Sequence, residues 1–95
     1  MTYKLVVKPE AELDILESAK WYENQQKGLG IRFVNSIDKK ILNILENPLK
    51  YQVRYKETRF ALVKRFPFSI HFLVEEDKIQ ILAVLSTHRN PQIWK

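Results

Sequence analysis

The chain has 95 residues and a mass of 11.4 kDa, which suits a single domain with one hydrophobic core. Hydrophobic residues make up 45% of it and charged residues 28%, a balance that excludes a disordered chain. Cysteine is absent, which excludes disulfides and thiol nucleophiles and suits a reducing compartment. No apolar run approaches the roughly 18 residues of a transmembrane helix. We therefore expect one domain over residues 1–95, in the cytoplasm and without a membrane partner.

The net charge of +5 is concentrated in the second half of the chain. Residues 1–47 carry seven basic and seven acidic side chains, whereas residues 48–95 carry nine basic and four acidic ones. Six of the nine lie between Lys50 and Arg65, where Glu57 alone opposes them. Such a stretch attracts phosphate or an acidic protein segment, although lysine and arginine also serve simply to solvate exposed strands.

The first half of the chain predicts one strand and two helices. Residues 3–7 are short, β-branched and apolar, which is typical of a strand. Pro9 suits the first turn of a helix, and acidic residues just after it favour the positive end of the helix dipole. That helix is expected to run to about Gln26 and to end at residues 27–30. A second amphipathic helix, with apolar residues at helical spacing from Val34 to Leu45, ends at Asn47-Pro48.

After Pro48 the period of the apolar residues changes to that of strands. Alternation around Phe60 and Leu62, and again from Phe68 to Val74, predicts two strands with one face in a core. Residues 75–78 form a polar hairpin turn, so that positions whose numbers sum to about 153 lie opposite each other. The following strand is apolar on both faces, as in a central strand.

The order is therefore β-α-α-β-β-β, and the fold class is α+β. A helical hairpin packed on one face of a mainly antiparallel four-stranded sheet satisfies this order, because the striped helices and the strand faces bury each other. The residues expected in the core are Val34, Ile37, Ile41, Leu62, Ile70, Phe72, Ile81 and Ala83.

Signatures of enzymes are largely missing from the sequence. There is no glycine-rich phosphate loop, no pair of histidines at helical spacing and no carboxylate cluster for a metal, so we expect neither a metal nor a cofactor. His71 lies within a strand pattern, which indicates a structural or surface role. His88 follows the last strand, where loops present binding or reactive groups on a rigid base, although it is equally consistent with a solvated strand end.

The order and spacing of several short motifs resemble the RelE/ParE superfamily of toxins from bacterial type II toxin–antitoxin modules, and within it the ParE-like plasmid-stabilisation branch. The motifs are Lys20-Trp21-Tyr22-Glu23, Lys27-Gly28-Leu29-Gly30 with Phe33, Asn47-Pro48, Lys64-Arg65-Phe66-Pro67-Phe68, Ala83-Val84-Leu85, and His88-Arg89-Asn90-Pro91 with Trp94. The resemblance implies the fold predicted above. It also implies a small basic toxin that an acidic, partly disordered antitoxin neutralises by wrapping around it.

Two toxic activities occur among such proteins. RelE-like members cleave ribosome-bound mRNA without a metal, whereas ParE-like members bind DNA gyrase. Ser69 stands where RelE-like ribonucleases carry an arginine, and Trp94 lies nearest to the usual C-terminal tyrosine. Serine cannot replace a guanidinium at a phosphate, nor can indole replace a phenol in proton transfer. The departures favour a non-enzymatic gyrase inhibitor, with a ribosome-dependent endoribonuclease as the alternative and a weakened or non-toxic relative as a second one.

The candidate site residues follow from the basic stretch and the end of the last strand. If the protein is a nuclease, Lys64, Arg65, His88 and Arg89 are the catalytic candidates. The binding candidates are Arg54, Lys56, Arg59, Lys64, Arg65, His88, Arg89 and Trp94. The hairpin register places Phe66-Pro67 beside residues 86–88, so Arg65 and Arg89 are expected to converge on an anion or an acidic side chain. The alternative is that Arg89 forms a local salt bridge and Trp94 only holds the C-terminus onto the sheet.

Overall fold

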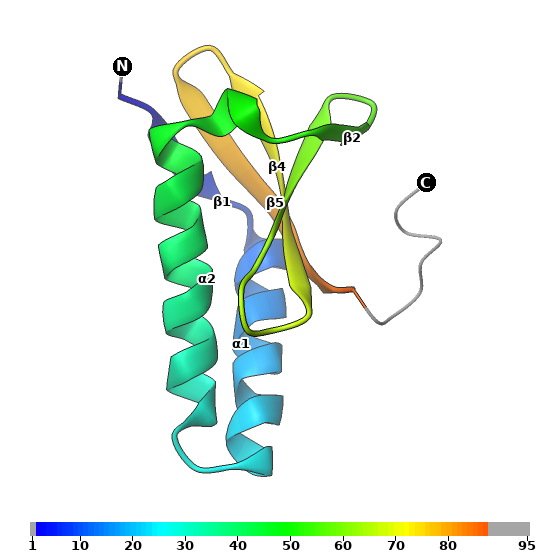
Figure 1. Ribbon diagram of the computed structural model, residues 1–95. Helices are drawn as coiled ribbons and strands as arrows, with labels where there is room; N and C mark the ends of the chain where they lie inside the picture. The colour runs from blue at the N-terminus through cyan, green and yellow to red at the C-terminus, as the bar shows by residue number, and fades with distance from the viewer. Residues whose placement is uncertain (1, 88–95) are drawn as a thin grey trace.

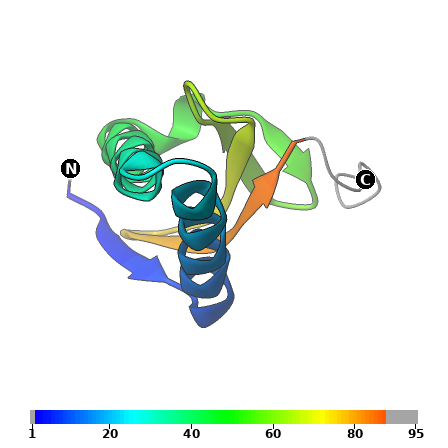
Figure 2. The same ribbon diagram turned by 90° about the horizontal axis from the view of Figure 1, so that it is seen from below.

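The computed structural model describes residues 2–87, which form two helices packed against one five-stranded sheet (Figure 1). The elements in chain order are β1 (Lys4–Val7), α1 (Pro9–Gln25), α2 (Leu29–Glu46), a 3-10 turn (Pro48–Lys50), β2 (Val53–Tyr55), β3 (Thr58–Leu62), β4 (Phe68–Glu75) and β5 (Lys78–Ser86). The predicted α+β class and the helical hairpin are confirmed. The two helices lie side by side, and in the view from below α2 is seen almost end-on while α1 is seen obliquely (Figure 2).

The sheet has the strand order β1-β5-β4-β3-β2, so β5 is central. It contains five strands rather than the expected four, because residues 53–55 pair with β3 as an additional edge strand. This strand is too short and too exposed to produce an alternating apolar pattern. β1 runs parallel to β5, and all other pairs are antiparallel. Between β1 and its parallel partner β5 the chain forms both helices and the three antiparallel strands, so the parallel pair is joined by a long connection.

The hairpin of β4 and β5 has the predicted turn but contains one irregularity. Pairs sum to 153 from Glu75↔Lys78 to Phe72↔Ile81, and to 154 from His71↔Ala83 to Phe68↔Ser86. Leu82 is the extra residue of a β-bulge. At the far end the Thr87 amide donates to the Pro67 carbonyl over 2.8 Å, which confirms that residues 66–67 lie beside the end of β5.

The bulge changes which residues of β5 face the helices. Ile79 and Ile81 are buried, and after the bulge Val84 takes the core position. The expectation that Ala83 belongs to the core is therefore corrected: it is only half-buried and lies opposite His71. The Val84 amide donates to the Asp14 carboxylate of α1 over 3.0 Å, which ties the first helix to the central strand beyond the point where β1 ends.

The faces of β3 are also reversed with respect to the prediction. Ala61 is paired with Ile70 and is buried with it, whereas Leu62 is paired with Ser69 and is 58% exposed. Leu62 is thus a second correction to the expected core, because cross-strand partners must share a face of the sheet. Of the other expected core residues, Val34 is half-buried against the core, and Ile37, Ile41, Ile70, Phe72 and Ile81 are buried.

The turn between the helices is held by a carboxylate. Glu23 accepts hydrogen bonds from the amides of Gly28 and Gly30 at 3.0 to 3.1 Å, and these bonds lower the pKa of its side chain. Gly28 has a φ of 88°, a conformation that most residues avoid. The turn reverses the chain within three residues, so α2 lies antiparallel against α1.

Candidate functional site

The predicted binding residues of the basic stretch do not form one cluster. Arg54 lies on β2 with its guanidinium 4.7 Å from the centre of the Phe60 ring, and Lys56 lies in the turn after β2 with its ammonium 5.6 Å from the Tyr55 ring. Both side chains are exposed. Lys64 and Arg65 lie at the other end of β3, in the loop that leads to β4.

Arg59 has a structural contact. Its guanidinium donates to the Tyr51 carbonyl over 2.6 Å and to the Leu49 carbonyl over 3.4 Å. These bonds satisfy carbonyl groups in the segment between the 3-10 turn and β2. The Arg59 side chain is half-buried, so it holds this connection in place rather than presenting its charge as openly as Arg54 does.

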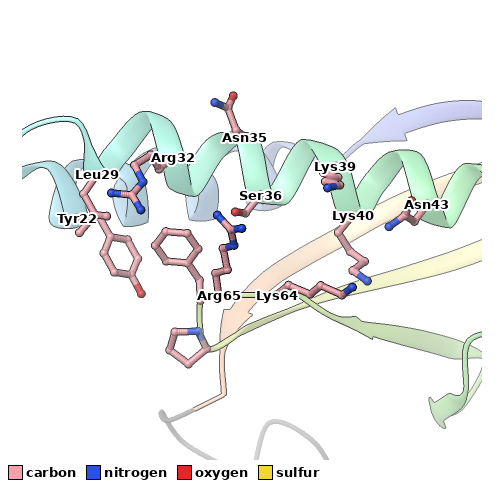
Figure 3. Close-up of a pocket in the computed structure, with 12 residues that line it drawn as sticks. Tyr22, Leu29, Arg32, Asn35, Ser36, Lys39, Lys40, Asn43, Lys64 and Arg65 are labelled. Carbon is pink, nitrogen blue, oxygen red and sulfur yellow. The ribbon is translucent and has the colours of Figure 1, made fainter.

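Lys64 and Arg65 line a groove of about 750 Å³ between α2 and the loop that joins β3 to β4 (Figure 3). We call it the α2 groove. Its lining consists of Tyr22, Leu29, Arg32, Asn35, Ser36, Lys39, Lys40, Asn43, Lys64, Arg65, Phe66 and Pro67. Five of these side chains are cationic, and none is a carboxylate. The groove is therefore a concentrated positive surface with neutral hydrogen-bonding groups between its charges.

The pKa of Lys40 responds both to burial and to the cations around it. Burial, followed by the nearby charges of Lys64 and Lys50, lowers the pKa of Lys40. The ammonium of Lys40 and that of Lys64 extend into the same part of the groove (Figure 3). Repulsion between like charges in the folded chain is relieved either by unfolding or by a bound anion.

Replacing Lys40 by glutamine is expected to raise the melting temperature of the free protein slightly. The lowered pKa means that the protonated lysine is less favourable in the folded than in the unfolded state, so its removal stabilises the fold by less than about 1 kcal/mol, as for other surface charge pairs. Lys20→Gln, on the exposed side of α1, is the control. A melting temperature lowered by Lys40→Gln in calorimetry at low salt would contradict the repulsion.

Ser69 and His71 lie on the face of the sheet that points away from the helices. Ser69 is fully buried, and its hydroxyl is 3.1 Å from Nε2 of His71 and 3.5 Å from the Leu85 carbonyl. The imidazole lies 6.4 Å from the Phe60 ring, centre to centre. Burial and the charge of Arg54 lower the pKa of His71. Ser69 is therefore a buried polar residue whose hydroxyl interacts with neighbouring groups of the sheet.

The stability of the wild type is expected to fall as the pH is lowered through about 6.5, in part because of His71. Its folded pKa lies below the ordinary value of 6.5, so near this pH the unfolded state binds more protons and protonation favours unfolding. Urea unfolding of the wild type and of His71→Gln measures the effect. The variant should lose less free energy of unfolding as the pH is lowered, and equal losses would show that His71 does not titrate as described.

His88, Arg89 and Trp94 lie outside the described residues, so their predicted convergence with Arg65 stays a prediction. The groove also contains three cations that sequence reasoning missed: Arg32, Lys39 and Lys40. They recur at seven and eight residues along the polar side of α2, a signal that the search for apolar stripes passed over. Their proximity to Lys64 and Arg65 depends on how α2 packs, which the local sequence does not express.

Within residues 2–87 no group of three or more histidine, aspartate or glutamate side chains is arranged to hold a metal ion. None of the helices described there has the length and apolar character needed to cross a membrane.

The fold is similar to that of a solved toxin–antitoxin protein. A chain of the chromosomal ParDE TA system from P. aeruginosa matches with a TM-score of 0.82 and 20% sequence identity, over 92% of this chain and 98% of that one. At this identity the likeness shows a shared fold. A comparison with curated proteins gives no match.

The family model of the ParE toxin of the type II toxin–antitoxin system parDE matches residues 5–91. The match covers nearly the whole chain, so the protein belongs to the ParE toxin family. The resemblance seen in the sequence motifs is thereby confirmed.

Proposed function

We propose that this protein is a toxin that arrests growth by binding DNA gyrase and that an acidic antitoxin neutralises it. The observation that carries the proposal is the match to the ParE toxin family over residues 5–91. The P. aeruginosa chain of similar fold comes from a ParDE toxin–antitoxin system. Both the gyrase target and the antitoxin partner are inferred from this membership.

The surroundings of Ser69 support inhibition by binding rather than RNA cleavage. Ser69 occupies the position at which the similar RelE-like ribonucleases carry an arginine. Here the side chain is fully buried, uncharged and hydrogen-bonded to its neighbours in the sheet. A buried hydroxyl cannot stabilise the charge that develops on a cleaved phosphate in the way that an exposed guanidinium does.

The exposed cations at the β2 edge support the antitoxin part of the proposal. Arg54 and Lys56 project from a short edge strand whose three residues are all exposed. An acidic segment would meet complementary charge there, and such charge mainly accelerates encounter. The association rate between toxin and antitoxin should therefore fall as the salt concentration rises. For the variant Arg54→Gln/Lys56→Gln the association rate should fall less steeply. Equal salt dependence of this variant and the wild type would count against the β2 edge as the place of encounter.

Two assays on the purified protein separate the candidate activities. We expect inhibition of gyrase-catalysed supercoiling and no cleavage of ribosome-bound mRNA. Arg65→Ala and Arg89→Ala should weaken the inhibition more than His88→Ala, because the arginines carry permanent charge. Truncation before Trp94 tests whether the C-terminal residues contribute, and Lys20→Ala on α1 is the control.

The alternatives give different results in the same assays. Cleavage of ribosome-bound mRNA that His88→Ala abolishes would make the protein a ribonuclease, with His88 as acid or base. Activity in neither assay, together with normal growth on induction, would make it a non-toxic relative. If every variant folded and remained as toxic as the wild type, toxicity would not depend on the residues changed, namely Arg65, Arg89, His88 and Trp94.

A further inference from the structure

The α2 wall of the groove presents a regular series of hydrogen-bond donors. Arg32, Ser36, Lys39 and Asn43 lie at positions i, i+4, i+7 and i+11 of one helix, and all line the groove. Eleven residues of α-helix span about 16 Å. Cations thus alternate with neutral donors along the groove, and these are the residue types that contact phosphate oxygens of nucleic acids.

The opposite wall is formed by Lys64 and Arg65, and Arg65 has an unusual backbone. Its φ is 76°, a left-handed conformation that strains a residue with a Cβ by about 1–2 kcal/mol. In this conformation the guanidinium extends across the groove toward Ser36 of α2 (Figure 3). Non-glycine residues in strained conformations cluster at functional sites. The strain at Arg65 brings a fifth permanent charge into a groove that already holds four.

At the apolar end of the groove, Tyr22 and Phe66 already pack on each other and on the core. Tyr22 and Phe66 are 4.9 Å apart, centre to centre, and each packs on Phe33, at 5.2 and 5.3 Å respectively. The rings therefore fill the space between the helices and the loop with one another. Protein partners gain most of their affinity from a few apolar or aromatic anchors in pockets, whereas nucleic acids gain it from charge.

We infer that the α2 groove binds the phosphate backbone of one strand of a nucleic acid. The cations of both walls lie against the phosphates, and Asn43 and Ser36 donate to phosphate oxygens between them. Binding relieves the repulsion that, after burial, contributes to the lowered pKa of Lys40. This inference goes beyond the proposed function and does not depend on gyrase, because the groove contacts the nucleic acid directly.

Fluorescence anisotropy with labelled oligonucleotides of one sequence tests the inference, without gyrase or antitoxin present. Single-stranded DNA, duplex DNA and single-stranded RNA are titrated over a series of salt concentrations. The order of affinity among the three oligonucleotides shows which kind of nucleic acid the groove prefers. For the wild type, the logarithm of the binding constant should fall linearly with the logarithm of the salt concentration.

The decisive variants neutralise the same number of charges inside and outside the groove. Arg32→Gln/Lys39→Gln removes two exposed groove cations, so the salt slope should decrease by about 2 and the affinity at low salt by about tenfold or more. Lys4→Gln/Lys20→Gln removes two exposed cations that do not line the groove, and it should change the affinity by less than about threefold. Equal losses in the two variants would mean that only the net charge of the protein matters, and the inference would fail.

Arg65→Gly provides a test that a merely structural role cannot mimic. Glycine adopts a positive φ without strain, so this variant should melt at the same or a higher temperature than the wild type while binding the oligonucleotide more weakly. Unchanged binding would remove Arg65 from the site. A Glu-rich peptide is the competing ligand: if it binds more tightly than every oligonucleotide, with the same dependence on Arg32 and Lys39, the groove is a site for an acidic protein and the inference is wrong.

Discussion

Ile81→Asp is expected to prevent folding. Ile81 is fully buried in the central strand, paired with Val7 on one side and Phe72 on the other. A carboxylate at this position would lose its hydration without gaining a partner, and it would remove the packing of an isoleucine. The combined loss exceeds about 4 kcal/mol, which is most of the stability of a domain of this size. Circular dichroism and thermal melting would show a chain without a cooperative transition.

Leu62→Asp is the matched control, because the sequence pattern placed Leu62 and Ile81 in the same core. Leu62 lies on the face away from the helices and is 58% exposed, so the same change of side chain should alter the free energy of unfolding by less than about 1 kcal/mol. A cooperative transition near the wild-type temperature in Ile81→Asp, or an unfolded Leu62→Asp, would contradict the faces described for β5 and β3.

Gly30→Ala is expected to destabilise the helical hairpin by about 1–3 kcal/mol, as overpacking does elsewhere. A Cβ at Gly30 would lie 2.7 Å from the carbonyl oxygen of Ala19 and 3.0 Å from a carboxylate oxygen of Glu23. The first is backbone of α1, so the two helices must move apart. The second contact is with Oε1 of Glu23. This oxygen accepts a hydrogen bond from the Gly30 amide and so helps to hold the turn between the helices.

The helix propensity of alanine works in the opposite direction and makes the test sharp. Alanine is favoured over glycine by about 1 kcal/mol inside a helix, so a Gly30→Ala protein that is more stable than the wild type would show that the helices tolerate the Cβ. Asn35→Ala, at an exposed position of α2, reports propensity without a close contact and should be neutral or slightly stabilising. Urea unfolding of the three proteins gives the comparison.

The elements of this fold were predictable because each depends on a short stretch of sequence. Pro9 and Asn47-Pro48 mark helix ends through local backbone restrictions, and the periods of the apolar residues distinguish helix from strand. Residues 75–78 were recognised as a turn for the same reason. The edge strand β2 was not predicted, because three exposed residues paired through a bulge carry no periodic signal.

Charge could be located along the chain but not in space. The sequence placed six basic residues between Lys50 and Arg65, and the fold distributes them over the 3-10 turn at Lys50, the β2 edge, a structural contact of Arg59 and the α2 groove. The groove's other cations come from a helix some thirty residues earlier, at Arg32, Lys39 and Lys40. No local pattern joins these two segments, since their proximity follows from the packing of α2 against the loop between β3 and β4.

By itself, the sequence determined the α+β class, the helical hairpin, the order of the main strands and the family to which the chain belongs, because periodicity, breakers and motif spacing are properties of neighbouring residues. Only the tertiary structure decided which face of β3 and β5 is buried. A single bulged residue, Leu82, reverses the alternation along β5, and cross-strand pairing with Ile70 rather than side-chain size puts Ala61 in the core instead of Leu62. Register and packing connect residues far apart in the chain, and so they also decided which of the cations share the α2 groove.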